Sequence, residues 1–152
     1  MADHQEEQLR ELLDHVVGGL GLEATVQVDV DDEEIVGVLE GDDLGIFIGR
    51  HGATIEAVQH LAQRILLSDP SAPRRRIVVD AAGYRARRRE ALQKQADQAA
   101  AEALRFDRAV ALDAMTASER KLVHEHLRDR DDLETYSEGE EPDRHLVIAP
   151  AK

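Results

Sequence analysis

The sequence predicts an α+β fold, because segments with a helical pattern and segments with a strand pattern follow one another along its 152 residues. In the helical segments apolar residues recur every three or four positions, which places them on one face. In the strand segments apolar and polar residues alternate. The length allows one ordinary domain or two small ones, and the hydrophobic content of 42% is enough for a packed core.

The first half of the chain predicts a helix, two strands, a short helix, a loop, a longer helix and a third strand. Leucines and valines recur at helical spacing up to Gly18 and Gly19, which are stop signals for the first helix. The two strands are expected to pair as a hairpin around an acidic turn. The expected ranges are 5–19 for the first helix, 24–30 and 34–39 for the strands, 44–48 for the short helix, 53–67 for the longer helix and 76–80 for the third strand.

The second half predicts a long helix, a short strand, another helix and a final hairpin. Thr116 and Glu119 have the spacing of a capping box, in which a hydroxyl and a carboxylate bind free backbone N–H groups at a helix start. An acidic turn that contains a glycine separates the last two strands. The expected ranges are 83–105 and 117–128 for the helices and 109–112, 133–137 and 145–148 for the strands.

The first candidate site is the tetrapeptide Gly49-Arg50-His51-Gly52, which lies directly before the longer helix. Glycines at a helix start leave backbone N–H groups uncovered, and the two basic side chains add positive charge where a phosphate can approach. A KH domain clamps about four nucleotides of single-stranded nucleic acid with such a loop. The motif is short, so an ordinary turn at a helix start is the alternative.

The second candidate site lies on the capped helix. Arg120 and His124 are one turn apart on one face, and Lys121 is adjacent. A guanidinium beside an imidazole can hold a phosphate or the edge of a base while the helix fixes their relative position. The alternative is a solvated helix face.

A third candidate is a basic run at the start of the long helix. Cations in this place oppose the helix dipole, which a contact with nucleic acid would explain. Ion pairs with the acidic ends of the chain, with Asp80 or with Glu90 are the alternative. The run consists of Arg85, Arg87, Arg88 and Arg89.

Composition excludes several classes of site. Two Phe, two Tyr and no Trp are too few for a surface of several stacked aromatic rings, and core or ordinary surface positions are favoured for Tyr84 and Tyr136. There is no Cys, which excludes disulfides and thiolate metal sites. His124 and His126 lie on different sides of a helix and cannot chelate one metal. We expect no metal, no cofactor and no enzyme, because no nucleophile or nucleotide loop accompanies Glu119 and His124 as a conceivable acid and base.

The net charge of −13 hides a basic middle. Residues 1–43 carry −13, residues 44–130 carry +5 and residues 131–152 carry −5. The middle could therefore serve as an electrostatic footprint for nucleic acid.

No apolar run approaches the roughly 20 residues of a membrane span, and the N-terminus lacks the features of a signal peptide. We expect a cytoplasmic protein without membrane insertion.

The element order and the motif from Ile48 to Gly52 resemble a type II KH domain. Residues 80–88, 115–124 and 135–139 with Arg144 are similar to the Arg-x-x-x-His domain that follows KH in the bacterial Jag (SpoIIIJ-associated) family. The resemblance implies two small domains. These are a type II KH domain with a three-stranded sheet packed by helices at residues 1–80, and an Arg-x-x-x-His domain with three short strands and helices at residues 83–150.

The resemblance also implies a single-stranded RNA-binding protein without catalytic activity, with single-stranded DNA as a conceivable second ligand. The family has a role in post-transcriptional control linked to cell elongation and division, often beside a small single-KH partner protein. Gly49–Gly52 would form the KH clamp, with Arg120 and His124 as the signature pair of the second domain. The expected nucleic-acid contacts are Gly49, Arg50, His51, Gly52, Arg85, Arg87, Arg88, Arg89, Arg120, Lys121 and His124.

One departure from the family and one alternative function stay open. Many family members carry an extra N-terminal domain before the KH unit, whereas this chain begins on the acidic first helix, so a membrane-proximal role tied to that domain is in doubt. The alternative function is a protein-interaction adaptor, in ribosome assembly or a division complex, that binds through its acidic ends.

Overall fold

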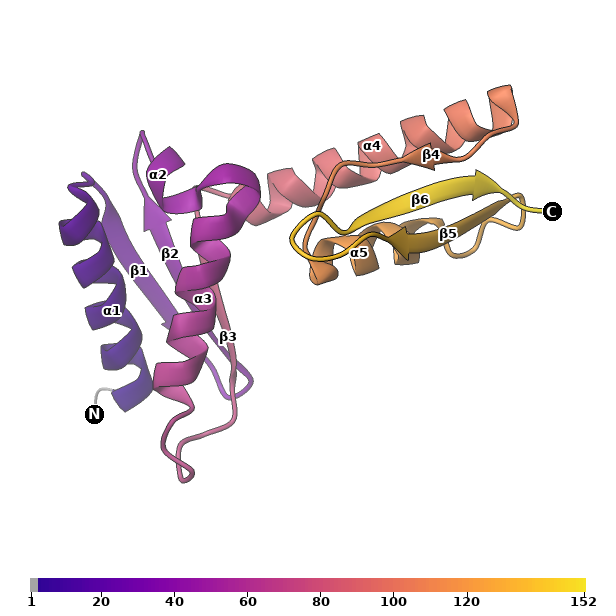
Figure 1. Ribbon diagram of the computed structural model, residues 1–152. Helices are drawn as coiled ribbons and strands as arrows, with labels where there is room; N and C mark the ends of the chain where they lie inside the picture. The colour runs from indigo at the N-terminus through magenta and orange to yellow at the C-terminus, as the bar shows by residue number, and fades with distance from the viewer. Residues whose placement is uncertain (1–2) are drawn as a thin grey trace. The chain divides into compact units, whose positions relative to one another are not determined.

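The computed structural model describes residues 3–152, and the chain forms two compact units, Met1–Arg85 and Ala86–Lys152 (Figure 1). The ranges expected from apolar spacing and capping are confirmed to within two residues at every end. The elements of the first unit are α1 (His4–Leu20), β1 (Thr25–Val30), β2 (Glu34–Glu40), α2 (Gly45–Ile48), α3 (Ala53–Leu66) and β3 (Arg76–Ala81).

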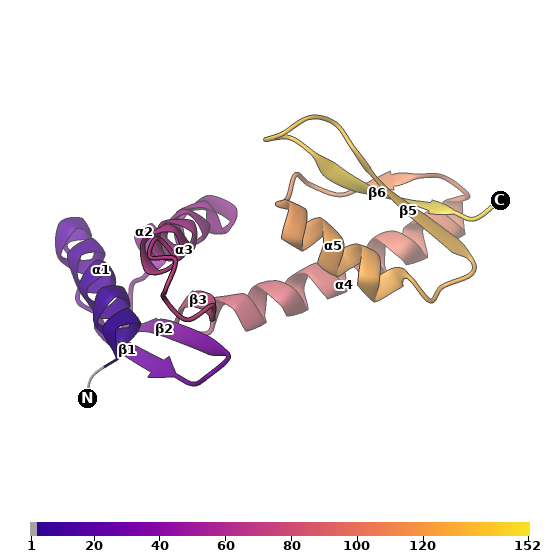
Figure 2. The same cartoon turned by 90° about the horizontal axis from the view of Figure 1, so that it is seen from below.

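The sheet of the first unit has the strand order β1-β2-β3. β1 and β2 form the expected antiparallel hairpin, and β3 lies parallel to β2 on its other side. A parallel pair needs a long crossover connection, which the segment containing α2 and α3 supplies. α1 and α3 cover the same face of the sheet (Figure 2). This is the three-stranded α+β arrangement expected for the first domain.

The core of the first unit lies between this sheet and its helices. Leu9 and Leu13 of α1 and Ile35 of β2 are fully buried. Gly37 of β2 is on the same face, and a Cβ there would lie 2.6 Å from Cδ1 of Leu13. The absence of a side chain at Gly37 therefore lets α1 pack directly onto the central strand.

The N-terminus of α1 is fixed by Asp3. Its carboxylate accepts hydrogen bonds from two backbone N–H groups of the first turn and pairs with Nη1 of Arg75 at 2.7 Å. The hydrogen bond from Arg75 lowers the pKa of Asp3. Nε2 of the buried Gln5 donates to the carbonyl oxygens of Leu66 and Pro73, both at 3.1 Å. The start of α1 is thereby tied to the end of α3 and to the loop before β3.

The second unit contains most of α4 and a second three-stranded sheet. Its strand order is β4-β6-β5 with antiparallel neighbours. The expected capping box is present at the start of α5, where Thr116 Oγ1 accepts from the backbone N–H of Glu119 and the Glu119 carboxylate accepts from that of Thr116. The elements are α4 (Tyr84–Phe106), β4 (Val110–Ala111), α5 (Ala117–Leu127), β5 (Leu133–Glu138) and β6 (His145–Pro150).

The helix α4 contributes mostly alanines to the core of the second unit. Ala96, Ala99 and Ala103 of α4 are buried together with Val123 of α5 and Ile148 of β6. Alanines on the buried face let α4 approach its neighbours closely.

Across residues 3–152, none of the helices combines the length and the apolar character that a membrane crossing requires.

Candidate nucleic-acid interface

The loop between α2 and α3 has a positive φ at three of its four residues. Gly49 has φ 75°, His51 has φ 54° and Gly52 has φ 77°. Glycine adopts such angles freely, whereas a residue with a Cβ pays a steric penalty. Arg50–Gly52 form a single tight turn, after which α3 begins at Ala53.

Both glycines also lie against side chains that occupy the space of a Cβ. A Cβ on Gly49 would lie 2.3 Å from Oγ1 of Thr54, and a Cβ on Gly52 would lie 2.5 Å from the hydroxyl oxygen of Tyr84. Tyr84 itself packs against the core of the first unit. This agrees with the core or ordinary surface position that the sequence favoured for this ring. The loop therefore needs glycine at both positions for its shape alone.

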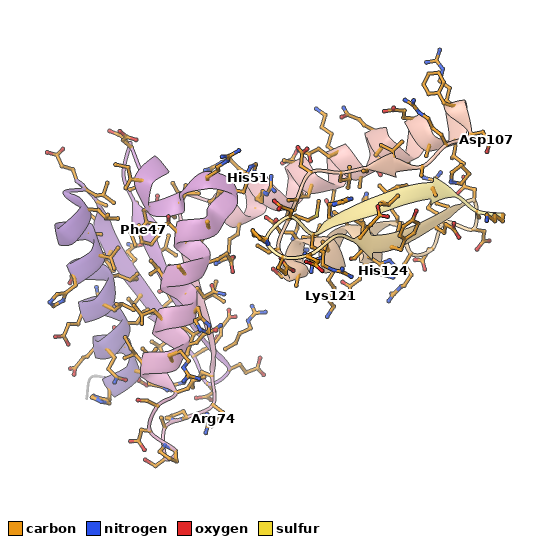
Figure 3. The ribbon with its side chains drawn as sticks, viewed as in Figure 1. Phe47, His51, Arg74, Asp107, Lys121 and His124 are labelled. Atoms are coloured by element: carbon orange, nitrogen blue, oxygen red, sulfur yellow. The ribbon has the colours of Figure 1, made fainter. Side chains whose placement is uncertain are left out.

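Between the glycines, the loop presents two free backbone donors and two exposed basic side chains. Within residues 3–152, the backbone N–H groups of Arg50 and His51 have no hydrogen-bond partner. The side chains of both residues are exposed, and that of His51 is labelled in Figure 3. The buried Phe47 anchors α2 behind them. Such a surface can accept an anion through N–H donors and cationic side chains together.

Arg85 differs from the open cation expected at the start of α4. Its Nε donates to the carbonyl oxygen of Val79 at 2.7 Å, its Nη1 pairs with Glu56 at 2.7 Å and its Nη2 donates to Oε1 of Gln59 at 2.8 Å. The guanidinium therefore joins the start of α4 to β3 and α3. Arg85 is therefore ion-paired, as the alternative interpretation of the basic run stated. The partner of its guanidinium is Glu56 and not Asp80 or Glu90. Asp80 instead accepts a hydrogen bond from the backbone N–H of Arg85.

The remaining arginines of the basic run lie in the second unit and divide by exposure. Arg88 pairs with Glu119 at 2.9 Å, which links α4 to the start of α5, and both side chains are mostly buried. Arg87 and Arg89 are exposed. Their contact with nucleic acid stays a prediction, whereas the position of Arg88 is that of a structural ion pair.

A groove of about 430 Å³ lies between α5 and β5 in the second unit. It brings together the three residues predicted on α5 and adds others that the sequence did not single out as site residues. The basic and hydroxyl-bearing residues of its lining are Arg120, Lys121, His124, Thr135, Tyr136, Ser137 and Arg144. Four basic residues, together with the hydroxyls of Thr135 and Ser137, can bind a phosphate by charge and by hydrogen bonds.

The three predicted residues hold different positions in this groove. The side chain of Arg120 is only 10% exposed, so a solvated helix face is the wrong description of it. Its Nη1 donates to the carbonyl oxygen of Met115 at 2.7 Å. His124 forms a hydrogen bond through Nδ1 to Oγ1 of Thr135, and Lys121 is exposed on α5 (Figure 3).

Thr135 and Ser137 could have been found from the strand pattern. They pair with Ile148 and Leu146, which are core residues of β6, so their side chains point to the side of the sheet that α5 covers. Tyr136 lies between them, pairs with Val147 and also lines the groove. Only the position of α5 beside the edge strand, which the sequence does not reveal, makes these hydroxyls part of a groove.

Comparison with protein families gives two matches along the chain. Residues 6–79 match the KH domain of KhpA and KhpB, and residues 90–150 match the R-3-H domain, which is the Arg-x-x-x-His domain. The two matches follow one another in the order expected from the motifs. They place the Gly49–Gly52 loop in the first domain and the groove in the second.

Curated relatives match along both domains. The RNA-binding protein KhpB of Clostridium symbiosum is 33% identical over 141 residues, which cover 91% of this chain and 63% of that protein. The protein of the same name from Lactiplantibacillus plantarum is 35% identical over 150 residues, which cover 97% of this chain and 46% of that protein. The chain thus spans about half to two thirds of the length of these relatives. With its two domains matched in the same order, the chain belongs to the KhpB (Jag) family.

Proposed function

We propose that this protein binds single-stranded RNA without catalysing a reaction on it. The observation that carries the proposal is the Gly49–Gly52 loop, where two unpaired backbone N–H groups and two exposed basic side chains face solvent together. Phosphates of a single strand are the ligands that such a loop accepts. The relatives named RNA-binding protein support RNA as the ligand.

The groove between α5 and β5 supplies a second set of contacts under this proposal. Lys121, His124 and Arg144 would bind phosphates, and the hydroxyls of Thr135 and Ser137 would donate to phosphate or ribose oxygens. Arg87 and Arg89 extend the positive charge along α4. Because these groups recognise the backbone, sequence preference would depend on how bases lie beside them.

At the level of the cell, we propose a post-transcriptional regulator that acts with a small single-KH partner protein. The family resemblance supports this role, and the charge split supports a partner, because the acidic first 43 residues are poorly suited to RNA. A chain that binds RNA with its middle and a protein with its acidic end would bring the two together.

A charge reversal in the loop tests the proposed function. Arg50→Asp with His51→Asp places repulsion where phosphates are expected, and both side chains are exposed, so the fold should be kept. Affinity for a single-stranded RNA, measured by filter binding, should fall at least about tenfold, or about 1.4 kcal/mol. The wild-type affinity should also decrease steeply between low and high salt, as phosphate contacts require.

His60→Asp with Arg64→Asp is the matched control, because it makes the same charge change on the exposed face of α3. This variant should lose much less affinity than the loop variant. Equal losses would mean that only the net charge matters and would remove the loop from the mechanism. Absence of RNA binding by the wild type at either salt concentration would favour the protein-interaction adaptor.

A further inference from the structure

The turn between β5 and β6 places an acidic side chain against Arg120, one of the residues that line the groove of the second domain. Nη2 of Arg120 donates to Oε1 of Glu141 at 3.0 Å. The Arg120 side chain is 10% exposed, whereas that of Glu141 is 61% exposed. A fixed, mostly buried cation is thus paired with a carboxylate that can turn away into solvent.

Contacts of Arg144 and Glu141 hold the turn in place, and the backbone N–H of Met115 donates to the carbonyl oxygen of Arg144 at 3.2 Å. Nη1 of Arg144 donates to the carbonyl oxygen of Gly139 at 2.6 Å, and Glu141 pairs with Arg120. In the described part of the chain, the neighbouring Glu140 makes no hydrogen bond or ion pair through its side chain. The exposed acids of this turn are Glu138, Glu140, Glu141 and Asp143.

We propose that Glu141 sets the selectivity of the groove, because its carboxylate occupies Arg120 in the free protein and an RNA phosphate has to displace it. The inference rests on the proposed function, since it takes the groove as a phosphate-binding surface. Carboxylate and phosphate both accept hydrogen bonds from a guanidinium. Exchanging one for the other at Arg120 therefore contributes little to binding.

A ligand gains affinity only if it makes further contacts at the same time. Lys121 and His124 offer these on α5, and Thr135 and Ser137 offer hydroxyls on β5. A single phosphate that reaches Arg120 alone only replaces Glu141. A strand that engages several groups at once is favoured over isolated anions, so Glu141 acts as a selectivity residue.

The test compares Glu141→Gln with Glu140→Gln in the full chain. Affinity for a short single-stranded RNA of random sequence is measured by fluorescence anisotropy at low salt. The amide of Glu141→Gln keeps an oxygen for Arg120 but removes the competing charge, so this variant should bind about three to ten times more tightly than the wild type. Glu140→Gln makes the same charge change in the same turn and should differ from the wild type by less than about twofold.

Aspartate at the same two positions separates competition from net charge. Glu141→Asp keeps the charge of the turn and withdraws the carboxylate from Arg120 by one methylene, so it should also bind RNA more tightly. Glu140→Asp should not. Because the shorter side chain leaves the charge unchanged, a gain in Glu141→Asp cannot come from weaker long-range repulsion.

Equal affinities of the Glu141 and Glu140 variants would overturn the inference. Weaker binding by both Glu141 variants with unchanged melting temperatures would overturn it as well, because Glu141 would then support binding. If Glu141→Gln lowers the melting temperature, the Glu141→Asp comparison decides. A wild type that fails to bind RNA contradicts the proposed function itself, whereas normal wild-type binding with no difference among variants removes only the role of Glu141.

Discussion

Gly49 and Gly52 show how single residues determine the shape of the candidate RNA clamp. Both have a positive φ, and each faces a neighbouring side chain at a distance that leaves no room for a Cβ. The neighbour of Gly52 is the hydroxyl of Tyr84, which comes from the start of α4 and lies in the same unit. The loop is therefore shaped both by its own backbone and by a distant side chain.

Gly52→Ala should destabilise the first unit by about 1–3 kcal/mol, since it adds both a strained φ and a close contact with Tyr84. Part of this cost comes from the hydroxyl. In a Tyr84→Phe background, the same substitution should therefore cost less, and urea unfolding of the four proteins gives the coupling free energy. A coupling free energy near zero would show that the backbone angle alone requires glycine.

The arginines illustrate what the sequence could and could not reveal at this scale. Charge and spacing predicted Arg120 as a candidate site residue but not Arg144, and both line the groove. Arg85 and Arg88 pair with residues far away in the chain: Glu56 is 29 residues from Arg85, and Glu119 is 31 residues from Arg88. The structure is therefore needed to distinguish these paired arginines from the exposed ones, because residues so far apart in the sequence cannot be identified as partners from local patterns.

At the scale of elements, α1 depends on the residue that caps it. Asp3 accepts from the first turn of the helix and pairs with Arg75, whose hydrogen bond lowers the pKa of the Asp3 carboxyl below its ordinary value of 3.8. A carboxyl with a lowered pKa in the folded state adds stability while it is ionised. This stability is present above pH 3.8 and is lost as the pH falls through the lower pKa of the folded state.

Asp3→Ala should therefore lower the free energy of unfolding by about 1 kcal/mol near neutral pH. The difference from the wild type should shrink when unfolding is measured at pH values below 3.8, because the carboxylate that the variant lacks is then protonated in both states. Circular dichroism during urea unfolding at several pH values provides the measurement. The exposed Asp14 is the control, and a constant difference for Asp3→Ala across this range would contradict the role of its charge.

Local patterns predicted the elements well because helix caps, glycine stops and strand alternation act over a few residues. The capping box at Thr116 fixed the start of α5 as predicted. The predicted stop at Gly18 and Gly19 was wrong in detail, because both lie inside α1 and the helix is capped by Gly21, which has a positive φ of 66°. The pairing of elements was harder to predict. Nothing local requires that β3 lie parallel to β2 or that β6 lie between β4 and β5, since these arrangements depend on packing against the helices.

At the scale of the whole molecule, charge is divided along the chain. The acidic first 43 residues and the basic middle give opposite potentials in a protein whose net charge is −13. Some of the acids have structural roles: Oδ1 of Asp31 accepts from the backbone N–H groups of Glu33 and Glu34, and Glu34 pairs with Arg76. Others are exposed and carry no ion pair within residues 3–152, and these are Asp32, Glu33, Asp42 and Asp43.

Neutralising these four acids as Asn or Gln should tighten binding to a random single strand severalfold at low salt. The four acids repel phosphates from a distance, and such repulsion is screened beyond about 10 Å at 0.1 M salt. The affinities of variant and wild type should therefore converge as salt rises, which filter binding over a salt series can show. The same affinity at low salt would identify the acidic end as a solubility feature or a protein-docking surface.

The chain has only two tyrosines and no tryptophan. One of them, Tyr84, touches the loop at Gly52, and the other, Tyr136, lies on β5 at the groove. Incorporation of fluorotyrosine would give the protein two fluorine NMR signals, one for each candidate contact. RNA that engages only the loop would move one signal, and a strand that engages both domains would move two. The native sequence thus carries its own pair of spectroscopic reporters, with which occupancy of the loop and of the groove can be followed separately in one sample.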